Sequence, residues 1–309
     1  MNKLLVILGP TATGKTDLAL QLAHKFQGEL ISADSRQVYK SLDIGTGKMP
    51  SSNGQLRKGK GYWEIDGIKI WMYDVVNPKD QYNVARFAKD AGRIVEDIYT
   101  REKLPILVGG SGLYLKAFLE GLSNLTIPVD KKLRKDLKKQ TLSQLQEQLK
   151  KVFPERWQEM NYSDRQNPRR LIRAIELAET QNTKVTGQNY DALKIGLTAP
   201  REILYLRIDG RVNSRIKQGM VNEAKTLRRS GLSLKRMKQL GLEYGVLADY
   251  LEGEINNPSE LIKIMQNKIH NFVRRQTTWF KKTKDVFWFD ITEREYTHKI
   301  EKVIEKWYD

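Results

Sequence analysis

The chain has 309 residues, of which 39% are hydrophobic and 29% charged, and its net charge is +17 at pH 7. This composition is typical of a folded globular protein, and no apolar run approaches the roughly 18 residues that a membrane-spanning helix needs. Cysteine is absent. That excludes disulfides, a cysteine zinc site and a thiol nucleophile, and we expect a cytoplasmic protein with no membrane contact.

Strands and helices alternate in the first part of the chain. Apolar runs at 4–8, 30–33 and 104–108 predict three strands, and apolar side chains at helical spacing predict an amphipathic helix over 83–101. Residues 51–61 (SSNGQLRKGKG) predict an exposed loop. The alternation predicts an α/β fold, in which a parallel sheet carries helices on both faces.

The pattern then changes. Residues 130–182 are polar, basic and helical in period, which predicts an all-helical insertion at 121–193. We expect the core to resume over 194–309, with strands at 203–208 and 286–291. The predicted organisation is therefore a catalytic core in two segments, interrupted by a helical insertion.

The positive charge is concentrated in the later part. The net charge is +4 over residues 1–120 and +13 over residues 121–309. Such an excess favours binding to a polyanion such as nucleic acid. A solvated basic surface would give the same excess, so charge alone leaves both interpretations open.

Residues Gly9–Thr16, GPTATGKT, match the phosphate-binding pattern G-x-x-x-x-G-K-[ST] between a predicted strand and a predicted helix. Successive N–H groups and a helix N-terminus attract a phosphate, Lys15 adds a charge, and the Thr16 hydroxyl can hold Mg²⁺. This predicts a bound di- or triphosphate and leaves open what it is attached to. The predicted phosphate-binding residues are Gly9, Pro10, Thr11, Ala12, Thr13, Gly14, Lys15 and Thr16.

A nucleotide kinase usually carries a second acidic residue at the end of a neighbouring strand, but one strand here ends in Gly109–Gly112. Asp34 ends another strand and is a candidate metal ligand, general base or simple cap. In open α/β sheets ligands bind at the carboxyl ends of the strands. We therefore expect segments 9–16, 34–39 and 109–114 to face one crevice.

Two later segments are rich in cations. Asn167–Arg173 opens a helix in which Arg169 and Arg173 share a face, which suits contact with phosphates. Arg274–Lys282, RRQTTWFKK, interleaves cations with aromatic rings, which suits phosphate contact and base stacking. A solvated basic face, or a core helix with a buried Trp279, would give the same patterns.

Together these segments resemble the tRNA dimethylallyltransferase (tRNA isopentenyltransferase) family, in the family's order. The matching segments are GPTATGKT at 9–16, ISADSRQVY at 31–39, LDIGTGK at 42–48, LPILVGGSGLYLKAFLEGL at 104–122, NPRRLIRAIE at 167–176, RIDGRV at 207–212 and RRQTTWFKK at 274–282. The resemblance implies a P-loop core and an enzyme that transfers a dimethylallyl group from dimethylallyl diphosphate to tRNA. The product would be N6-dimethylallyladenosine immediately 3′ of the anticodon, in tRNAs that read codons starting with U, together with diphosphate.

The resemblance also implies roles for single residues. The phosphate loop would hold the donor's diphosphate with Mg²⁺ at Thr16, Arg211 would steady it, and Asp34 would accept a hydrogen bond from adenine N6 as general base. Ser111 stands where the family usually has Thr. The implied catalytic residues are Asp34, Lys15, Ser111 and Arg211. The implied tRNA-contacting residues are Asp34, Ser35, Arg36, Gln37, Ser111, Arg134, Arg169, Arg170, Leu171, Ile172, Arg173, Lys238, Gln239, Leu240, Gly241, Leu242 and Glu243.

Residues 238–243 depart most from the family pattern, A-I-G-Y-K-E. The expected partners are the anticodon stem-loop of tRNA and the prenyl donor, and we expect a monomer. Three other functions stay open. An adenylate prenyltransferase of cytokinin type shares the front motifs, but the basic later half favours tRNA. A kinase is disfavoured by the glycines after Val108, and a non-catalytic RNA-binding P-loop protein would not require both Asp34 and Lys15.

Overall fold

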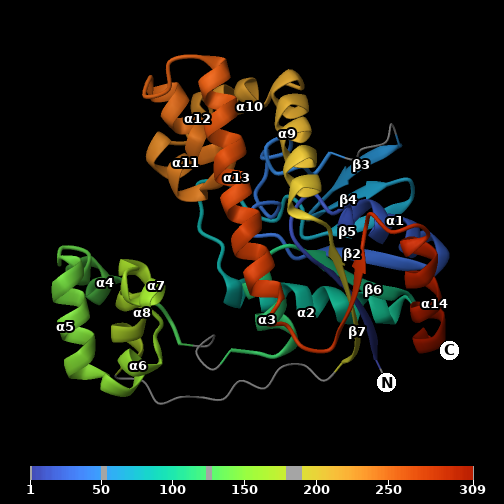
Figure 1. Cartoon of the computed structure of the whole chain (residues 1–309), viewed down its shortest axis with the longest axis horizontal. Helices are drawn as coiled ribbons and strands as arrows, with labels where there is room; N and C mark the ends of the chain where they lie inside the picture. The colour runs from blue at the N-terminus through green and yellow to red at the C-terminus, as the bar shows by residue number, and fades with distance from the viewer. Residues whose placement is uncertain (1, 50–53, 123–126, 179–189, 309) are drawn as a thin grey trace. The chain divides into compact units, whose positions relative to one another are not determined.

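The structure of the chain is a computed structural model (Figure 1), and the residues that it describes are 2–49, 54–122, 127–178 and 190–308. The chain divides into two compact units, unit 1 at 1–119 and 189–309 and unit 2 at 120–188. The predicted insertion, 121–193, runs a few residues into unit 1, because a strand of the sheet already begins at Asp191.

Unit 1 is built on an eight-stranded sheet of order β3-β4-β5-β2-β6-β1-β7-β8. The hairpins β3-β4 and β4-β5 are antiparallel and all other pairs are parallel, which confirms the predicted fold class. The strands are β1 (Lys3–Leu8), β2 (Gly28–Ser32), β3 (Leu56–Gly59), β4 (Tyr62–Ile65), β5 (Ile68–Trp71), β6 (Leu104–Gly109), β7 (Asp191–Thr198) and β8 (Val286–Asp290).

Side chains of the central strand β1 point alternately to the two faces of the sheet, and each face carries a hydrophobic core. Leu4, Val6 and Leu8 join a buried cluster on one face of the sheet, and Leu5 and Ile7 join a second cluster on the other. Helices α2, α3 and α9 to α13 contribute to the first cluster, and α1 and α14 to the second. Each fully buried Leu or Ile stabilises the fold by about 1.5–3 kcal/mol relative to exposure. The helices of unit 1 are α1 (Lys15–Lys25), α2 (Val84–Thr100), α3 (Gly112–Leu119), α9 (Arg201–Lys217), α10 (Met220–Arg229), α11 (Leu234–Leu240), α12 (Leu242–Glu252), α13 (Pro258–Phe280) and α14 (Tyr296–Tyr308).

Most elements expected from periodicity are confirmed. The runs at 4–8, 30–33, 104–108 and 286–291 correspond to β1, β2, β6 and β8. The helix expected over 83–101 is α2. Its cap is Asn83, whose side chain accepts the Arg86 N–H at 2.9 Å, so an orphan donor of the first turn is satisfied.

Two expectations are wrong. Residues 203–208 lie in α9 and not in a strand, because Leu204, Ile208 and Val212 recur every fourth residue and bury one helical face. The strand that pairs with β1 lies earlier, at β7. In the predicted loop 51–61, residues 51–53 lie outside the described residues, whereas Leu56–Gly59 forms β3 and pairs with β4.

Helices joined by short turns make up the described residues of unit 2, as expected for 130–178; residues 179–182 of the predicted helical stretch lie outside them. Leu137, Leu145, Leu149 and Leu171 form its small core with neighbouring apolar side chains. Among the described residues of the whole chain, no helix is both long and apolar enough to cross a membrane. The helices of unit 2 are α4 (Lys131–Leu137), α5 (Leu142–Val152), α6 (Pro154–Glu159), α7 (Tyr162–Arg165) and α8 (Pro168–Leu177).

Candidate active site

The phosphate-binding segment forms the turn between β1 and α1. Gly9 has φ +140°, and a Cβ there would lie 2.3 Å from the Leu197 carbonyl oxygen, so only glycine fits beside β7. Gly14 has φ +82° and caps the N-terminus of α1. Thr13 is fully buried and its hydroxyl donates to the Pro10 carbonyl at 2.9 Å. The loop is therefore held in a curved shape, with the first amides of α1 at its mouth.

Two cationic side chains, Lys15 and Arg211, donate hydrogen bonds to this loop. The Lys15 ammonium donates to the Pro10 carbonyl oxygen at 2.6 Å, and the Arg211 guanidinium donates to Thr11 Oγ1 at 2.9 Å. Desolvation, with the charge of Arg211, lowers the pKa of Lys15 to about 7, against a smaller opposing effect of Asp34. Desolvation and the neighbouring Arg215 also lower the pKa of Arg211. A bound diphosphate would favour the charged forms of these neighbouring cations.

Arg211 retains hydrogen-bonding capacity. Its Nε is shielded from solvent and has no hydrogen-bond partner among the described residues. A buried donor without a partner costs free energy, so this atom indicates a place for an acceptor such as a phosphate oxygen. Burial also lowers the pKa of Arg215, whose guanidinium donates to the Gly45 carbonyl oxygen at 3.0 Å and lies 3.7 Å from the Glu243 carboxylate.

Asp34 begins a turn after β2, and one of its carboxylate oxygens closes that turn. Oδ1 accepts the Arg36 N–H at 2.7 Å and the Gln37 N–H at 3.4 Å. Ser111 Oγ accepts the Ser35 N–H at 3.2 Å. The cap interpretation is thus correct for Oδ1, whereas no hydrogen bond of Oδ2 is recorded among the described residues. One oxygen fixes the carboxylate and the other stays available for chemistry.

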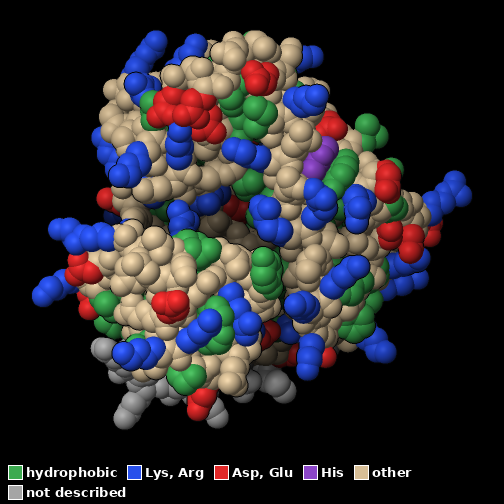
Figure 2. All heavy atoms as spheres, turned by 60° about the vertical axis from the view of Figure 1, so that its left-hand side comes forward, with side chains coloured by type: hydrophobic (Ala, Val, Ile, Leu, Met, Phe, Trp, Pro, Cys, Tyr) green, Lys and Arg blue, Asp and Glu red, His purple; other side chains and the backbone are tan. Residues whose placement is uncertain are grey.

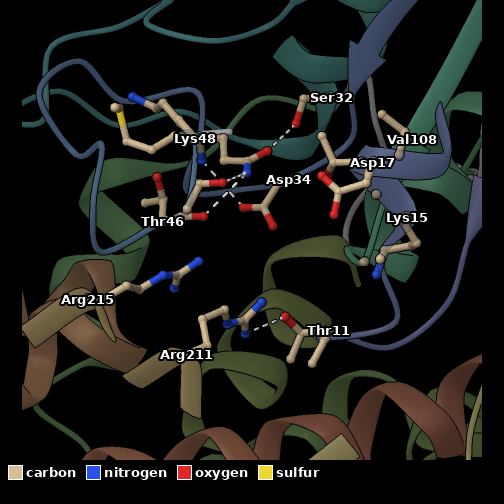
Figure 3. A pocket seen from close by; sticks show the side chains of 18 of the residues that line it. Thr11, Lys15, Asp17, Ser32, Asp34, Thr46, Lys48, Val108, Arg211 and Arg215 are labelled. Carbon is tan, nitrogen blue, oxygen red and sulfur yellow. Dashed lines mark hydrogen bonds between the residues drawn. The ribbon is translucent and has the colours of Figure 1, made fainter. Parts of the chain in front are cut away.

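The three predicted segments meet at a cavity of about 430 Å³ in unit 1. Figure 3 shows Arg211 and Arg215 reaching toward the Asp34 carboxylate, with Lys15 farther along the wall. A second cavity of about 100 Å³ adjoins it, and Asp34 lines both. The second cavity also includes Ser35, Arg36, Ser111, Leu242 and Glu243. The expected common crevice is confirmed, and its two parts share the Asp34 carboxylate.

One wall of the larger cavity is the loop 42–48, which is held by side chains from elsewhere. The Glu223 carboxylate accepts the N–H groups of Asp43, Ile44 and Gly45 at 2.7–3.1 Å, as well as the Tyr244 hydroxyl at 2.6 Å. Three consecutive amides on one carboxylate make this wall rigid.

Gln37 and Lys48 fix the same wall from inside the cavity. Gln37, expected to contact tRNA, instead bonds Ser32 and donates to the Thr46 carbonyl oxygen. Lys48 is buried and pairs with Asp43 and Asp74 at 3.0 and 2.5 Å. In this structure both side chains support the wall.

Residues 238–243 divide into two parts. Gly241, Leu242 and Glu243 lie at the second cavity or next to Arg36. Lys238 instead forms ion pairs with three carboxylates of α12 and its end, and Leu240 is fully buried. Gln239 accepts a hydrogen bond from Arg236, also outside the cavities. Of the predicted tRNA-contacting residues 238–243, Gly241, Leu242 and Glu243 therefore lie at or beside the second cavity, and 238–240 lie away from it.

In unit 2 the residues predicted to contact RNA also lie in different surroundings: some are paired, one is exposed and two are buried. Arg134 and Arg173 both bind Glu176, at 2.6 and 2.5 Å, and Arg170 pairs with Asp164. Arg169 is exposed and has no side-chain partner among the described residues. The side chains of Leu171 and Ile172, also predicted to contact tRNA, are buried in the core of the unit.

Several site residues escape sequence reasoning. Asp17, Ser32, Arg215 and Gln276 line the larger cavity. Two of them could have been found from their positions in the sequence. Asp17 directly follows Thr16, and Gln276 lies in the RRQTTWFKK segment. Trp279 of that segment is half-exposed and its ring lies next to Gly112, so it is not the buried core residue that was one alternative.

The larger cavity offers oxygen atoms that suit Mg²⁺. The Thr16 hydroxyl has no hydrogen bond among the described residues and lies in the same cavity as Asp17 and Asp34. Mg²⁺ typically takes one or two protein oxygens and completes its shell with phosphate oxygens and water. A hydroxyl with two nearby carboxylates, beside a phosphate cradle, is a suitable donor set.

Basic side chains are spread over the visible face of the molecule (Figure 2). They come from many elements, in keeping with the net charge of +17. Such a surface attracts polyanions over a distance of about a Debye length, roughly 8–10 Å.

The chain resembles known proteins of one family over nearly its whole length. The family profile described as IPP transferase matches residues 37–283, and the one described as isopentenyl transferase matches residues 2–67. The chain is 40% identical over 285 residues to tRNA dimethylallyltransferase 2 of Treponema denticola, covering 90% of this chain and 91% of that protein. It is 35% identical to the tRNA dimethylallyltransferase of Bacillus mycoides, covering 98% and 95%.

Solved structures give the same result. The tRNA isopentenylpyrophosphate transferase of Bacillus halodurans superposes with a TM-score of 0.72 at 32% identity, covering 99% of this chain and 97% of that one. A eukaryotic dimethylallyltransferase acting on tRNA superposes with a TM-score of 0.78 at 25% identity, covering 98% and 77%. The chain belongs to the tRNA dimethylallyltransferase family, the P-loop prenyltransferases that modify tRNA.

Proposed function

We propose that this chain transfers a dimethylallyl group from dimethylallyl diphosphate to N6 of the adenosine immediately 3′ of the anticodon, in tRNAs that read codons starting with U. The observation that carries the proposal is the position of Asp34 between two adjoining cavities. The larger one contains the phosphate loop with its cations, and the smaller one is lined by the turn and by α12. A donor on one side and a base on the other would meet at this carboxylate.

The phosphate loop would bind the leaving diphosphate. Its amides, Lys15 and Arg211 present positive charge where negative charge grows as the donor's C1–O bond breaks. These groups are already fixed by the loop, so little reorganisation accompanies the reaction. Mg²⁺, held by Thr16 with Asp17, would supply further charge neutralisation to the leaving diphosphate.

Asp34 would orient and deprotonate the amine. The exocyclic N6 is a weak nucleophile, because its lone pair is delocalised into the ring. As N6 bonds to C1 of the donor, one N6 proton passes to Asp34 Oδ2, while Oδ1 stays fixed by the amides of the turn. The bond to the leaving oxygen breaks, and the diphosphate departs with the bonding electron pair.

The target base must leave its stack to reach this site. Single-stranded RNA is read by splaying out bases, and the small cavity beside Asp34, lined by Arg36, Leu242 and Glu243, is the place for adenine. Unit 2 would contact the rest of the stem-loop, with the exposed guanidinium of Arg169 among its contacts. We further propose that the enzyme acts as a monomer in the cytoplasm, where its tRNA substrate is found.

Two alternatives make different demands. An adenylate prenyltransferase would act on free AMP, and a kinase would require a phosphoryl acceptor and an acid after β6. The residues that follow β6 here are Gly110 and Ser111, and Gly110 is bound by a glutamine side chain. This arrangement supports prenyl transfer over phosphoryl transfer.

The test is an incubation with dimethylallyl diphosphate and either an anticodon stem-loop RNA or AMP. We expect the mass of the stem-loop to increase by one C5 unit, with an adenosine-to-guanosine change at the target position as the matched control that abolishes it. Faster transfer to AMP would establish the adenylate alternative. Hydrolysis of ATP without prenyl transfer would establish the kinase alternative.

A further inference from the structure

Gln276 is a buried polar residue in an otherwise apolar stripe. On α13 the buried positions are Leu261, Met265, Ile269, Val273 and Phe280, all apolar, and Gln276 is buried among them with 6% of its surface exposed. A buried amide is retained only when its donors and acceptors are satisfied, since leaving one unpaired costs about 1–3 kcal/mol. The amide of Gln276 should therefore have hydrogen-bond partners for both its oxygen and its nitrogen.

The amide bridges the two glycine turns of the site. Gln276 Oε1 accepts the Thr11 N–H at 2.9 Å, and Nε2 donates to the Gly110 carbonyl oxygen at 2.8 Å. A Cβ on Gly110 would lie 2.5 Å from Nε2, so the approach depends on glycine at that position. One side chain thus ties the donor loop after β1 to the turn after β6.

The bridge continues to the proposed base. Ser111 follows Gly110 directly, and its Oγ accepts the Ser35 N–H at 3.2 Å. The next amide, that of Arg36, donates to Asp34 Oδ1 at 2.7 Å. Four hydrogen bonds, joined by short stretches of backbone, therefore connect the phosphate-binding loop through Gln276 to the Asp34 carboxylate.

We propose that Gln276 is a positioning residue that sets the separation between the bound donor and the Asp34 carboxylate. This inference rests on the proposed function. Gln276 exchanges no proton and carries no charge; it holds two loops at a fixed distance, so that N6, C1 and the leaving oxygen lie in line. Near-attack geometry of this kind is sensitive, since a displacement of about 1 Å can cost roughly 100-fold in rate.

The first test replaces the bridge with an isosteric apolar chain. Gln276→Met keeps length and burial and removes both hydrogen bonds. We expect kcat to fall by about 10- to 100-fold, with KM for donor and for stem-loop each changed by less than about threefold. The matched control is Gln266→Met, the same substitution on the same helix at a half-buried position that lines neither cavity, which should keep the wild-type kcat.

A second variant breaks the bridge from its other end. Gly110→Ala places a methyl group against Nε2, and its Cβ meets nothing else closer than the Gly9 carbonyl oxygen at 3.5 Å. We expect a similar fall in kcat, and a double variant with Gln276→Met no worse than the stronger single one, because both remove one interaction. Additive losses would overturn the bridge.

The outcomes separate the two claims. If the wild-type enzyme transfers no prenyl group to the stem-loop, the proposed function fails. If it does, and Gln276→Met has the kcat of the wild type or loses only donor affinity, the positioning role fails. Melting temperatures and donor binding, measured on each variant, show whether a fall in kcat occurs in a folded enzyme with its donor bound.

Discussion

The charge state of Lys15 gives the sharpest prediction about donor binding. In the empty site its pKa is about 7, because desolvation and the Arg211 guanidinium disfavour the ammonium. A diphosphate favours the ammonium, so donor binding raises this pKa. Affinity linked to Lys15 is thus complete well below pH 7, and it falls as the pH rises through about 7, because the empty enzyme must then take up a proton to bind the donor.

The magnitude follows from the pKa. At pH 8 about 90% of empty enzyme has a neutral Lys15, so binding takes up about 0.9 proton, and each further pH unit raises the donor Kd about tenfold. Phosphate monoesters lose their last proton near about pH 6, so the donor's own charge is nearly constant in this range. The rise should continue until the pKa of the donor complex is reached.

The assay is titration calorimetry of the enzyme with dimethylallyl diphosphate, without tRNA, in two buffers of different ionisation enthalpy. The difference in apparent enthalpy gives the number of protons taken up. Lys15→Arg is the matched control, because arginine stays protonated throughout this range and its Kd should hardly depend on pH. A pH-independent Kd with no proton uptake in the wild type would refute the argument.

Three further predictions concern the base, the RNA surface and the stability of unit 2. Asp34→Asn keeps an oxygen for the Arg36 amide, so we expect the turn and the melting temperature to be unchanged. We expect kcat to fall by about 10²–10⁴-fold, and added Mg²⁺ should not restore it. Restoration by Mg²⁺ would make Asp34 a metal ligand. Arg169→Ala should raise KM for the stem-loop and reduce the slope of log K against log salt by about 0.7, whereas Arg156→Ala, whose partner is Glu159, should not. Glu176→Ala should destabilise unit 2 by about 1–3 kcal/mol, measured by denaturant unfolding, because it removes the buried carboxylate that Arg134, Arg173 and the Asp130 N–H share. The pKa of Glu176 is lowered from 4.5, chiefly by those arginines against the opposing effect of burial, so its stabilisation is present above that pH and is lost as the pH falls through the lower folded-state pKa.

The parts of the site that are contiguous in sequence were predictable. The loop Gly9–Thr16 carries its glycines, cation and hydroxyl within eight positions, and Asp34 directly follows an apolar strand, so type and spacing suffice. The meeting of these segments also followed, because the carboxyl ends of parallel strands share an edge. Functional residues that are close together in the sequence, at the ends of predicted strands, can therefore be identified from the sequence alone.

Contacts over long separations were not predictable in the same way. Gln276 lies 265 residues from Thr11 along the chain, and nothing in RRQTTWFKK distinguishes a residue that faces the site from one that faces RNA. The strand β7, DALKIGLT, mixes a lysine and a glycine into its apolar positions, whereas 203–208 shows a denser apolar run that forms a helix. Tertiary pairing with β1 overrides local appearance in β7, whereas the apolar repeat of Leu204, Ile208 and Val212 makes 203–208 part of a helix.

The position of β1 between β6 and β7 has a consequence for the order of assembly during synthesis. β1 is the first strand made, yet its register partner in β7 begins at Asp191, after the whole of unit 2. The carbonyl of Leu197 that confines Gly9, and the side chain of Gln276, emerge from the ribosome later still. Non-local pairing of this kind forms slowly. A nascent chain therefore cannot complete its phosphate cradle until most of the protein exists, and the donor is bound by the finished enzyme alone.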